Sequence, residues 1–342
     1  MRVRARAPLR LGLAGGGTDV SPYCDLYGGA VLNATIDKFA YASVEASDDG
    51  CLHFEATDLR QTARHAPSPE LELDGPLPLH AGVYNRVIKD FNDGRPLPLR
   101  MSTFSDAPPG SGLGSSSTLV VAMTRALLEW LNIPIGDYDL AKLAWDIERR
   151  EVGLAGGRQD HYAAAFGGFN FMEFNPGERV LVNPLRIKEN VLSELEASLL
   201  LYFGGVSRES AAIIDEQSGH VQRGEVAALA ASHALKTEAV SMKESLLTAN
   251  LECFVESMRV GWEAKKRIAS NISNPAIEDA YGCAEAAGMR AGKVSGAGGG
   301  GFMMMFVEPN RRMDVVRALG ELPGEVMGCH FTKRGAQGWR LP

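Results

Sequence analysis

Apolar and polar residues alternate along much of the first hundred positions, which is the pattern of strands with one buried face. Four segments show this alternation: 3–7, 29–36, 39–46 and 51–56. An apolar repeat of helical spacing follows over 83–91, and a further strand pattern over 97–104 leads into a glycine-rich run. The pattern predicts a β-rich start of the chain, with one helix ahead of the last of these strands.

Helical spacing dominates after residue 118. Leu119, Met123, Leu127 and Leu131 recur every four positions, which predicts a helix over 118–131. Further helices are predicted at 139–151, 158–165, 275–287 and 311–319, and as long amphipathic segments between 209 and 270. Further strands are predicted at 169–174, 198–203, 292–295, 302–307 and 325–331.

The length of 342 residues exceeds the size at which one hydrophobic core usually divides, so two domains are expected. The pattern changes near residue 185 without a proline- or serine-rich linker. We therefore expect an N-terminal domain of residues 1–185 and a C-terminal domain of residues 186–342.

Composition narrows the classes of function. A net charge of −7 argues against nucleic acid or an anionic membrane as a partner. The apolar runs are far shorter than the ~20 residues of a membrane span, and no signal peptide is recognisable. Five scattered cysteines without a Cys-x-x-Cys pair favour neither a disulfide framework nor a zinc site, so a cytoplasmic location is expected. The oligomeric state stays open, and a homodimer is compatible with the sequence.

The run Pro108-Pro-Gly-Ser-Gly-Leu-Gly-Ser-Ser-Ser117 carries the clearest chemical signal. Its glycines alternate with small residues, and three hydroxyl groups end it where the 118–131 helix begins. Free backbone N–H groups and the positive end of a helix dipole meet there, and glycine lets a phosphate approach the backbone. We expect a phosphate-binding loop, and the alternative is a glycine-rich turn with a serine cap. The run is not a Walker A loop, because it contains no lysine.

Two more glycine-rich segments accompany this loop, Gly15-Gly-Gly-Thr-Asp19 and Lys293-Val-Ser-Gly-Ala-Gly-Gly-Gly-Gly301. The second contains a Gly-x-Gly-x-x-Gly match, but too few residues follow it for a dinucleotide-binding domain, and alone it reads equally well as a glycine hairpin. The three motifs in this order resemble those of the GHMP kinases, the superfamily named for galactose, homoserine, mevalonate and phosphomevalonate kinases. The resemblance extends over nearly the whole chain.

The resemblance implies an α+β fold in two domains, an N-terminal one like ribosomal protein S5 and a ferredoxin-like C-terminal one, with the active site between them. It also implies ATP and Mg²⁺ as cofactors. Residues expected to contact ATP are Pro109, Gly110, Ser111, Gly112, Leu113, Gly114, Ser115, Ser116 and Ser117, together with Gly296, Ala297 and Gly298 from the second domain.

The resemblance also assigns roles outside the glycine-rich loops. Ser116 and Glu148 match the Mg²⁺ ligands, and Asp160 matches the catalytic aspartate. Arg10 matches a position beside the transferred phosphate. The residues expected to bind substrate are Thr18, Asp19 and Arg158.

The chemistry of phosphoryl transfer requires the same residue types, whatever the protein family. Mg²⁺ prefers few protein oxygens together with phosphates, an aspartate can accept the hydroxyl proton, and arginine neutralises developing charge. Each residue also has a simpler interpretation. Glu148 stands in a run of charges typical of a solvated helix face, Asp160 can cap a helix, and Asp19 can be a turn residue. His161 is expected to pack or face solvent without a role in the chemistry.

The first motif distinguishes branches of the superfamily. Its form Leu-Ala-Gly-Gly-Gly-Thr-Asp lacks the acidic residue and histidine of galactokinases and is similar to heptose 7-phosphate kinases and to the kinase portion of fucokinases. A chain of this length fits the heptose branch better. The resemblance then implies transfer of the ATP γ-phosphate to the anomeric hydroxyl of a heptose 7-phosphate, a small sugar phosphate, for nucleotide-activated heptose in capsule or surface polysaccharide.

A 7-phosphate substrate needs a basic group to hold that phosphate. The candidates are Arg158, Arg208, Lys333 and Arg334, and the sequence does not rank them. Two rival functions remain. One is an anomeric kinase of an unphosphorylated sugar such as fucose, and the other is a non-catalytic sugar sensor on the same fold.

Overall fold

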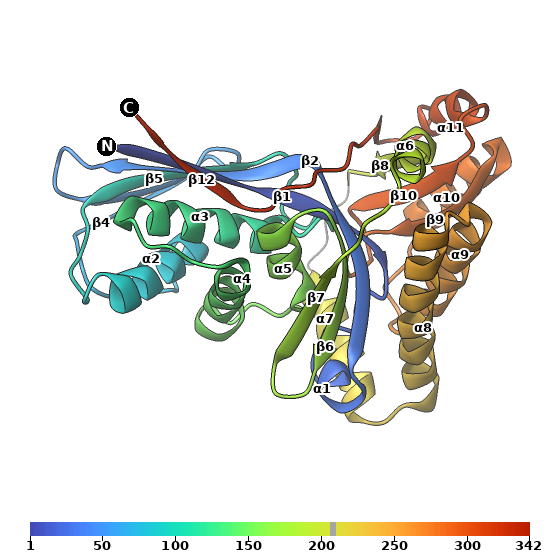
Figure 1. The fold of residues 1–342 in the computed structure, drawn as a ribbon, viewed down its shortest axis with the longest axis horizontal. Helices are drawn as coiled ribbons and strands as arrows, with labels where there is room; N and C mark the ends of the chain where they lie inside the picture. The colour runs from blue at the N-terminus through green and yellow to red at the C-terminus, as the bar shows by residue number, and fades with distance from the viewer. Residues whose placement is uncertain (206–209) are drawn as a thin grey trace.

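The computed structural model describes residues 1–205 and 210–342 of the chain. Two β-sheets, each covered by helices, lie side by side, with the N-terminal sheet at the left of Figure 1 and the C-terminal sheet at the right. The strands of the first sheet are β1 (Arg2–Ala14), β2 (Gly29–Ala46), β3 (Leu52–Ala56), β4 (Gln61–His65), β5 (Leu99–Ser105), β6 (Phe169–Asn175), β7 (Arg179–Pro184) and β12 (Gln337–Leu341). The strands of the second are β8 (Leu199–Phe203), β9 (Met289–Val294), β10 (Phe302–Val307) and β11 (Glu325–Met327).

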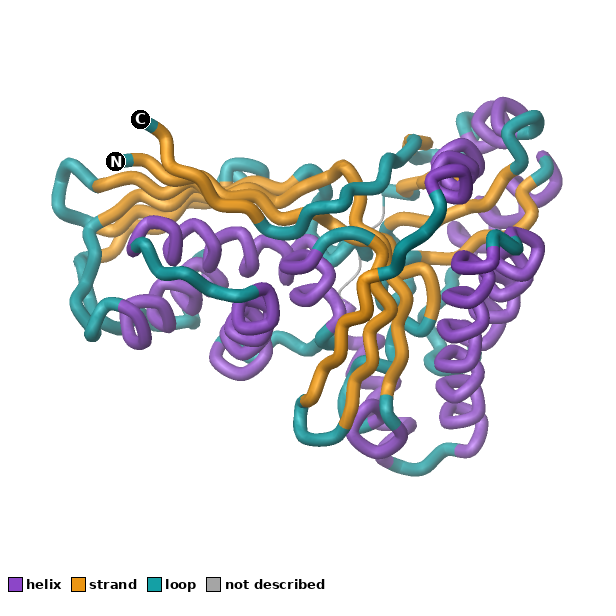
Figure 2. The backbone as a smooth tube through the Cα atoms, in the orientation of Figure 1, coloured by secondary structure: helices purple, strands orange, loops and turns teal. Residues whose placement is uncertain are grey.

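Five helices and one π-helical turn belong to the N-terminal half: α1 (Tyr23–Tyr27), α2 (Pro78–Phe91), α3 (Ser115–Leu131), α4 (Asp137–Asp146), η1 (Ile147–Glu151) and α5 (Gln159–Phe166). The C-terminal half contributes α6 (Glu189–Ser198), α7 (Ser210–Gln222), α8 (Val226–Thr248), α9 (Leu251–Lys266), α10 (Pro275–Ala287) and α11 (Arg312–Leu319). Figure 2 shows helices of the N-terminal half gathered below the first sheet.

The long strand β2 shapes the first sheet. The strand order is β12-β1-β2-β5-β3-β4, while β6 also pairs with β2, and β7 pairs with β6. Residues 40–46 of β2 pair with β5, and residues 29–34 pair with β6. As a result, the first half of β2 turns away with β6 and β7 toward α1 and α7, as Figure 1 shows.

The two domains share a hydrophobic core. In β10, Phe302, Met304 and Phe306 face this shared core, while the alternate residues face a separate cluster under α10 and α11. Leu9 and Leu11 of β1 lie in the same cluster as Phe302. Because this interface is apolar and continuous, the first and third glycine-rich segments are held at fixed positions.

Most of the predicted elements are present, and several predictions need correction. The segments 29–36 and 39–46 form one continuous strand rather than a pair, and the helix expected over 139–151 becomes the π-helical turn η1 at Ile147. The strand predicted over 325–331 covers only 325–327, as β11. A further strand, β12, follows it and pairs with β1. Thus residues 337–341, which the predicted division assigns to the C-terminal domain of residues 186–342, join the first sheet.

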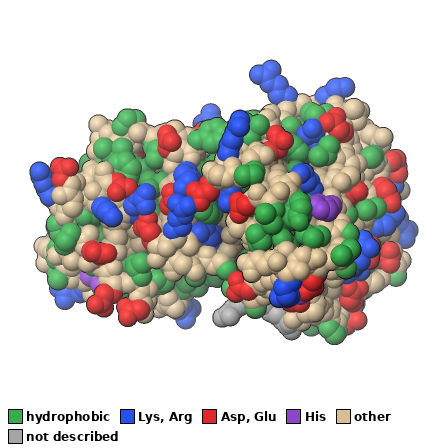
Figure 3. Space-filling model, turned by 90° about the horizontal axis from the view of Figure 1, so that it is seen from below, with side chains coloured by type: hydrophobic (Ala, Val, Ile, Leu, Met, Phe, Trp, Pro, Cys, Tyr) green, Lys and Arg blue, Asp and Glu red, His purple; other side chains and the backbone are tan. Residues whose placement is uncertain are grey.

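The surface and the cysteines agree with the composition. Acidic and basic side chains are interspersed on the face shown in Figure 3. Among the helices of residues 1–205 and 210–342, none is long and apolar enough to cross a membrane. All five cysteines are free thiols.

Candidate active site

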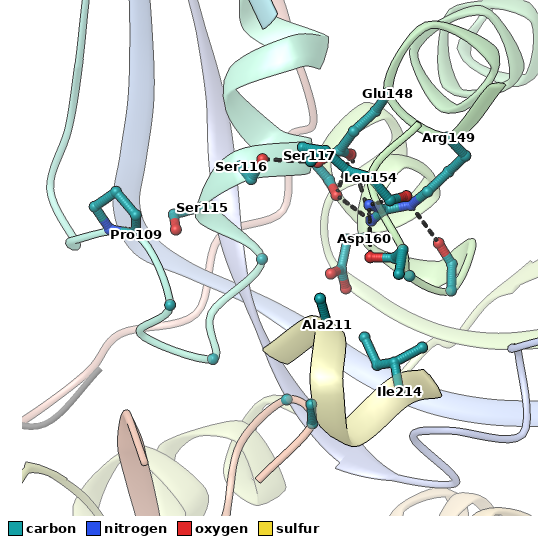
Figure 4. A pocket seen from close by; sticks show the side chains of 18 of the residues that line it. Pro109, Ser115, Ser116, Ser117, Glu148, Arg149, Leu154, Asp160, Ala211 and Ile214 are labelled. Atoms are coloured by element: carbon teal, nitrogen blue, oxygen red, sulfur yellow. Dashed lines mark hydrogen bonds and ion pairs between the residues drawn. The ribbon is translucent and has the colours of Figure 1, made fainter. Parts of the chain in front are cut away.

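A cavity of about 400 Å³ lies between the two domains. Figure 4 shows the start of α3, Glu148, Arg149 and Asp160 around it, with Ala211 and Ile214 of α7 below Asp160. The residues expected from the sequence that line it are Arg10, Pro109, Gly110, Gly112, Gly114, Ser115, Ser116, Ser117, Glu148, Asp160, Gly296 and Ala297. Residues up to 287 positions apart in sequence are therefore brought to one site (297 − 10).

The second and third glycine-rich segments contact each other through their backbones. A Cβ atom on Gly112 would lie 2.3 Å from the carbonyl oxygen of Ser295, and one on Gly296 would lie 2.7 Å from the Cα of Gly112. The Ser295 hydroxyl donates a 2.9 Å hydrogen bond to the carbonyl of Gly112. Glycine at 112 is required on two grounds, since its φ of +79° is also left-handed.

Helix α3 begins at the cavity, and among the described residues no side chain caps its first backbone N–H groups. The capping position is Gly114, which is also in a left-handed conformation. The hydroxyl of Ser115 turns back to the carbonyl of Pro108 at 3.2 Å instead. Such a helix start can bind phosphate oxygens through its N–H groups and its dipole.

Glu148 is buried rather than solvated. Its Oε1 accepts a 2.7 Å hydrogen bond from Ser116, and its Oε2 accepts 2.6 Å hydrogen bonds from Ser117 and His161. Burial alone would raise the pKa of Glu148, but Arg149, His161 and Ser117 outweigh it and lower the pKa to about 2. The solvated helix face considered for this residue is therefore wrong. Its carboxylate lies on η1, a π-helical turn, which is a feature frequent at functional sites.

His161 packs in the interior, which is one of the two positions expected for it, and it also bonds to Glu148. It is fully buried on α5, and its Nε2 must donate to Glu148 because a carboxylate can only accept. Among the residues described, Nδ1 of His161 has no hydrogen-bond partner. This contact could not be predicted from the residue pattern, because Glu148 and His161 lie on different elements.

Arg10 and Asp160 form an ion pair inside the cavity. Nε of Arg10 donates to Oδ1 of Asp160 at 2.6 Å, and Nη1 of Arg10 donates to the carbonyl of Gly112. Arg10 is nearly fully buried, whereas Asp160 keeps a fifth of its side chain exposed. The arginine thus fixes the orientation of a carboxylate that stays accessible from the cavity.

Lys265 at the end of α9 is a buried cation that sequence reasoning missed. Its Nζ donates to the carbonyl of Gly296 in the third glycine-rich segment. Burial and the neighbouring Arg10 lower its pKa to about 8, while Asp19 and Asp160 oppose this. In the sequence it belongs to a long amphipathic helix and resembles any other surface lysine.

Asp19 binds the start of α5 rather than facing solvent. Its Oδ2 accepts the backbone N–H groups of Arg158 and Gln159 at 2.9 and 3.1 Å, and its Oδ1 accepts from Gly17 and the Gln159 side chain. It lines a second, smaller cavity beside the first. Thr18 is buried and bonds to the carbonyls of Gly15 and Ala30.

Some of the expected residues lie elsewhere. Ser111, Leu113 and Gly298 do not line the cavity. The carbonyl of Ser111 accepts from the Phe302 N–H, and Leu113 lies in the shared core. Lys333 lines a separate cavity next to α6 and pairs with Glu189, and Arg334 is exposed beside it in sequence. Arg208 lies outside the described residues.

Ser116 and Glu148 fit a magnesium site. A serine hydroxyl and a carboxylate, 2.7 Å apart at the cavity wall, are the hard oxygen donors that Mg²⁺ takes when phosphates complete its shell. Within the described parts of the chain, no cluster of three or more His, Cys, Asp or Glu side chains could hold a metal without such phosphates.

Known protein families match both halves of this chain. Residues 78–168 match the N-terminal domain of the GHMP kinases, and residues 242–323 match their C-terminal domain. The chain belongs to the GHMP kinases and is an ATP-dependent kinase. The family and the mixed α+β fold expected from the sequence are thus confirmed.

Individual relatives refine the picture. A D-glycero-alpha-D-manno-heptose 7-phosphate kinase of Campylobacter jejuni is 45% identical over 99% of each chain. A solved structure from Bacteroides thetaiotaomicron, called a D-glycero-D-manno-heptose 1-phosphate kinase, is 44% identical, with a TM-score of 0.83 over 99% of each chain. The mevalonate kinase of Methanococcus jannaschii is 18% identical and shares the fold, with a TM-score of 0.76 over 96% of this chain and 98% of its own.

Proposed function

We propose that this kinase transfers the γ-phosphate of ATP to the anomeric C1 hydroxyl of D-glycero-D-manno-heptose 7-phosphate, giving the 1,7-bisphosphate. The observation that carries the proposal is the 45% identity, over 99% of both chains, to the heptose 7-phosphate kinase of Campylobacter jejuni. The product would supply nucleotide-activated heptose for capsule or surface polysaccharide. The free cysteines and the use of ATP fit a cytoplasmic enzyme.

The site supports a direct transfer. The uncapped start of α3 and the glycines before it bind the ATP phosphates, and Gly296 and Ala297 close the site from the other domain. Ser116 and Glu148 hold Mg²⁺, which when bound neutralises charge on the phosphates. Asp160 orients the C1 hydroxyl and accepts its proton, while Arg10 fixes that carboxylate and offsets charge developing on the transferred group.

Two other functions are tested by the same experiment. The name of the Bacteroides relative favours a heptose 1-phosphate as the acceptor, which would place the new phosphate at the other end of the sugar. A non-catalytic sensor is disfavoured because Ser116, Glu148, Asp160 and Arg10 are all present and line one cavity.

The test is ADP release with Mg-ATP against heptose 7-phosphate, heptose 1-phosphate, unphosphorylated heptose, mannose 6-phosphate, fucose and galactose. Turnover highest with heptose 7-phosphate, with the product phosphorylated at C1, would support the proposal. Preference for heptose 1-phosphate or fucose would keep the kinase and replace the substrate. ATP binding without turnover of any sugar would favour the sensor.

A further inference from the structure

A second cavity of about 280 Å³ adjoins the first. The walls of the two cavities have five residues in common, which are Arg149, Leu154, Ala155, Gly156 and Ile214. Asp160 lines the first cavity and Arg158 the second. Because these residues are two positions apart, their Cα atoms are separated by at most about 7 Å, and one elongated ligand can reach both.

Arg158 lines this second cavity and carries a buried donor without a partner among the described residues. The residue is only 5% exposed, and its Nη2 donates to Asp25 at 3.0 Å and to Ser21 at 3.4 Å. Its Nη1 has no hydrogen-bond partner among the described residues. A buried guanidinium N–H without an acceptor is costly, which points to an acceptor that a ligand supplies.

Trp145 also lines this cavity and carries a second buried donor without a partner among the described residues. The Arg158 guanidinium lies 5.4 Å from the centre of its ring, and its indole N–H is buried without a partner within the described residues. An indole N–H can only donate. Two residues that line one small cavity thus each carry an unpaired donor, and a ligand with several acceptor oxygens is the kind that could satisfy both.

The charges of the cavity allow an anion. Arg149 adds a second guanidinium to its wall. Two carboxylates line it among residues 1–205 and 210–342. One of them, Asp19, accepts four hydrogen bonds from Gly17, Arg158 and Gln159. Asp215 is exposed, so its charge is well solvated.

We propose that this second cavity binds the phosphate monoester at the end of the substrate remote from the hydroxyl that receives the new phosphate, with Arg158 and Trp145 as its donors. This inference rests on the proposed function. A phosphate group presents acceptor oxygens in every direction, and the planar guanidinium is matched to it in shape and charge. The cavity thus selects a sugar phosphate over the free sugar, while the first cavity performs the transfer.

The test compares kcat/KM for heptose 7-phosphate and for the unphosphorylated heptose in four proteins. In Arg158→Gln, kcat/KM for the phosphorylated sugar should fall about 10- to 100-fold, while the value for the free sugar should stay within about threefold. Trp145→Phe keeps an aromatic ring but removes the N–H, and it should lower kcat/KM about three- to tenfold, again for the phosphorylated sugar only. The matched control is Arg150→Gln, since Arg150 also contacts the Trp145 ring but is half exposed and outside both cavities.

The outcomes separate this inference from the proposed function. If the wild-type protein prefers the free sugar, the proposed function and this subsite both fail. If the wild-type protein prefers the phosphorylated sugar, but Arg158→Gln lowers kcat/KM equally for both sugars or for neither, the proposed function stands and the subsite is wrong. Trp145→Phe gives the same decision should Arg158→Gln fold poorly.

Discussion

The hydroxyl of Ser116 donates a 2.7 Å hydrogen bond to Oε1 of Glu148, which joins the first turn of α3 to the π-helical turn η1. This contact places a neutral and an anionic oxygen side by side at the wall of the cavity that holds Asp160. A pair of this kind can move from bonding with each other to binding one hard cation together.

Ser116→Ala should raise the Mg²⁺ concentration needed for half-maximal rate by about tenfold, because one oxygen donor is lost. The measurement is initial rate against free Mg²⁺ at saturating ATP. Ser115→Ala is the comparison, since the Ser115 hydroxyl bonds to Pro108 and not to Glu148, and it should leave the Mg²⁺ dependence in place. An unchanged magnesium titration in Ser116→Ala would remove this serine from the metal site.

Asp160→Asn should lower kcat about 10²- to 10⁴-fold, the range attributed to a positioned general base. ATP affinity should stay within about threefold, because Asp160 accepts its hydrogen bond from Arg10 and not from the N–H groups at the start of α3. Equilibrium titration with an ATP analogue measures the binding, and Asp137→Asn, exposed at the start of α4, is the control for carboxylate loss. Equal losses of ATP affinity and of rate would contradict the catalytic role.

The active site was largely predictable from the sequence, because its parts lie in short local motifs. Gly110, Gly112 and Gly114 alternate immediately before an apolar helix, and Asp160 follows a glycine-rich turn. The roles of Ser116, Glu148 and Asp160 came from the resemblance to a family. The structure places all three at one cavity, although their roles remain predictions.

Contacts between distant elements could not be predicted in the same way. Lys265 reaches the carbonyl of Gly296 from a helix whose periodicity shows only amphipathic character. The strand β12 pairs with β1 across more than 300 residues, so its short sequence held no sign of a partner. Glu148 is buried and accepts a hydrogen bond from His161, and nothing in a run of charged residues indicates which of them faces inward.

His161→Phe should destabilise the protein by about 1–3 kcal/mol and raise its Mg²⁺ requirement, because the buried Glu148 carboxylate loses a donor. His161→Gln retains an N–H that can reach the same oxygen and should recover most of both losses. Urea unfolding at pH 7 and a magnesium titration give the two readouts. If His161→Gln loses as much stability and needs as much Mg²⁺ as His161→Phe, the histidine acts through its shape and not through this hydrogen bond.

Gly112→Ala should cost about 2–5 kcal/mol and weaken ATP binding, because the new Cβ would lie 2.3 Å from the Ser295 carbonyl oxygen. Gly50→Ala is the matched control: its φ is +69°, but nothing lies within 4 Å of the added atom. The control should cost only about 1 kcal/mol for the left-handed backbone. The difference in unfolding free energy between Gly112→Ala and Gly50→Ala measures how closely the two glycine-rich segments pack. Equal losses of stability in the two variants would show that the segments leave room for a methyl group.

Lys265→Met should stabilise the protein and slow the reaction. The pKa of Lys265 in the folded protein, about 8, lies below its ordinary value of 10.5, so the unfolded chain binds the proton more tightly. The charged lysine therefore costs stability below pH 8, and this cost fades as the pH rises from 8 to 10.5. Replacing it should gain on the order of 1–3 kcal/mol at pH 7 and almost nothing at pH 10.5.

The activity of this variant should change in the opposite direction. Below pH 8 the Lys265 cation lies near Asp160 and Arg10 and adds positive charge where phosphate is transferred. The wild-type kcat/KM should then fall as the pH rises through about 8. In Lys265→Met, kcat/KM should be lower than in the wild type below pH 8 and should not fall as the pH passes 8. Unfolding free energies and pH–rate profiles of the two proteins test both halves. A gain in stability with an unchanged profile would show that the lysine is tolerated in the site without serving it.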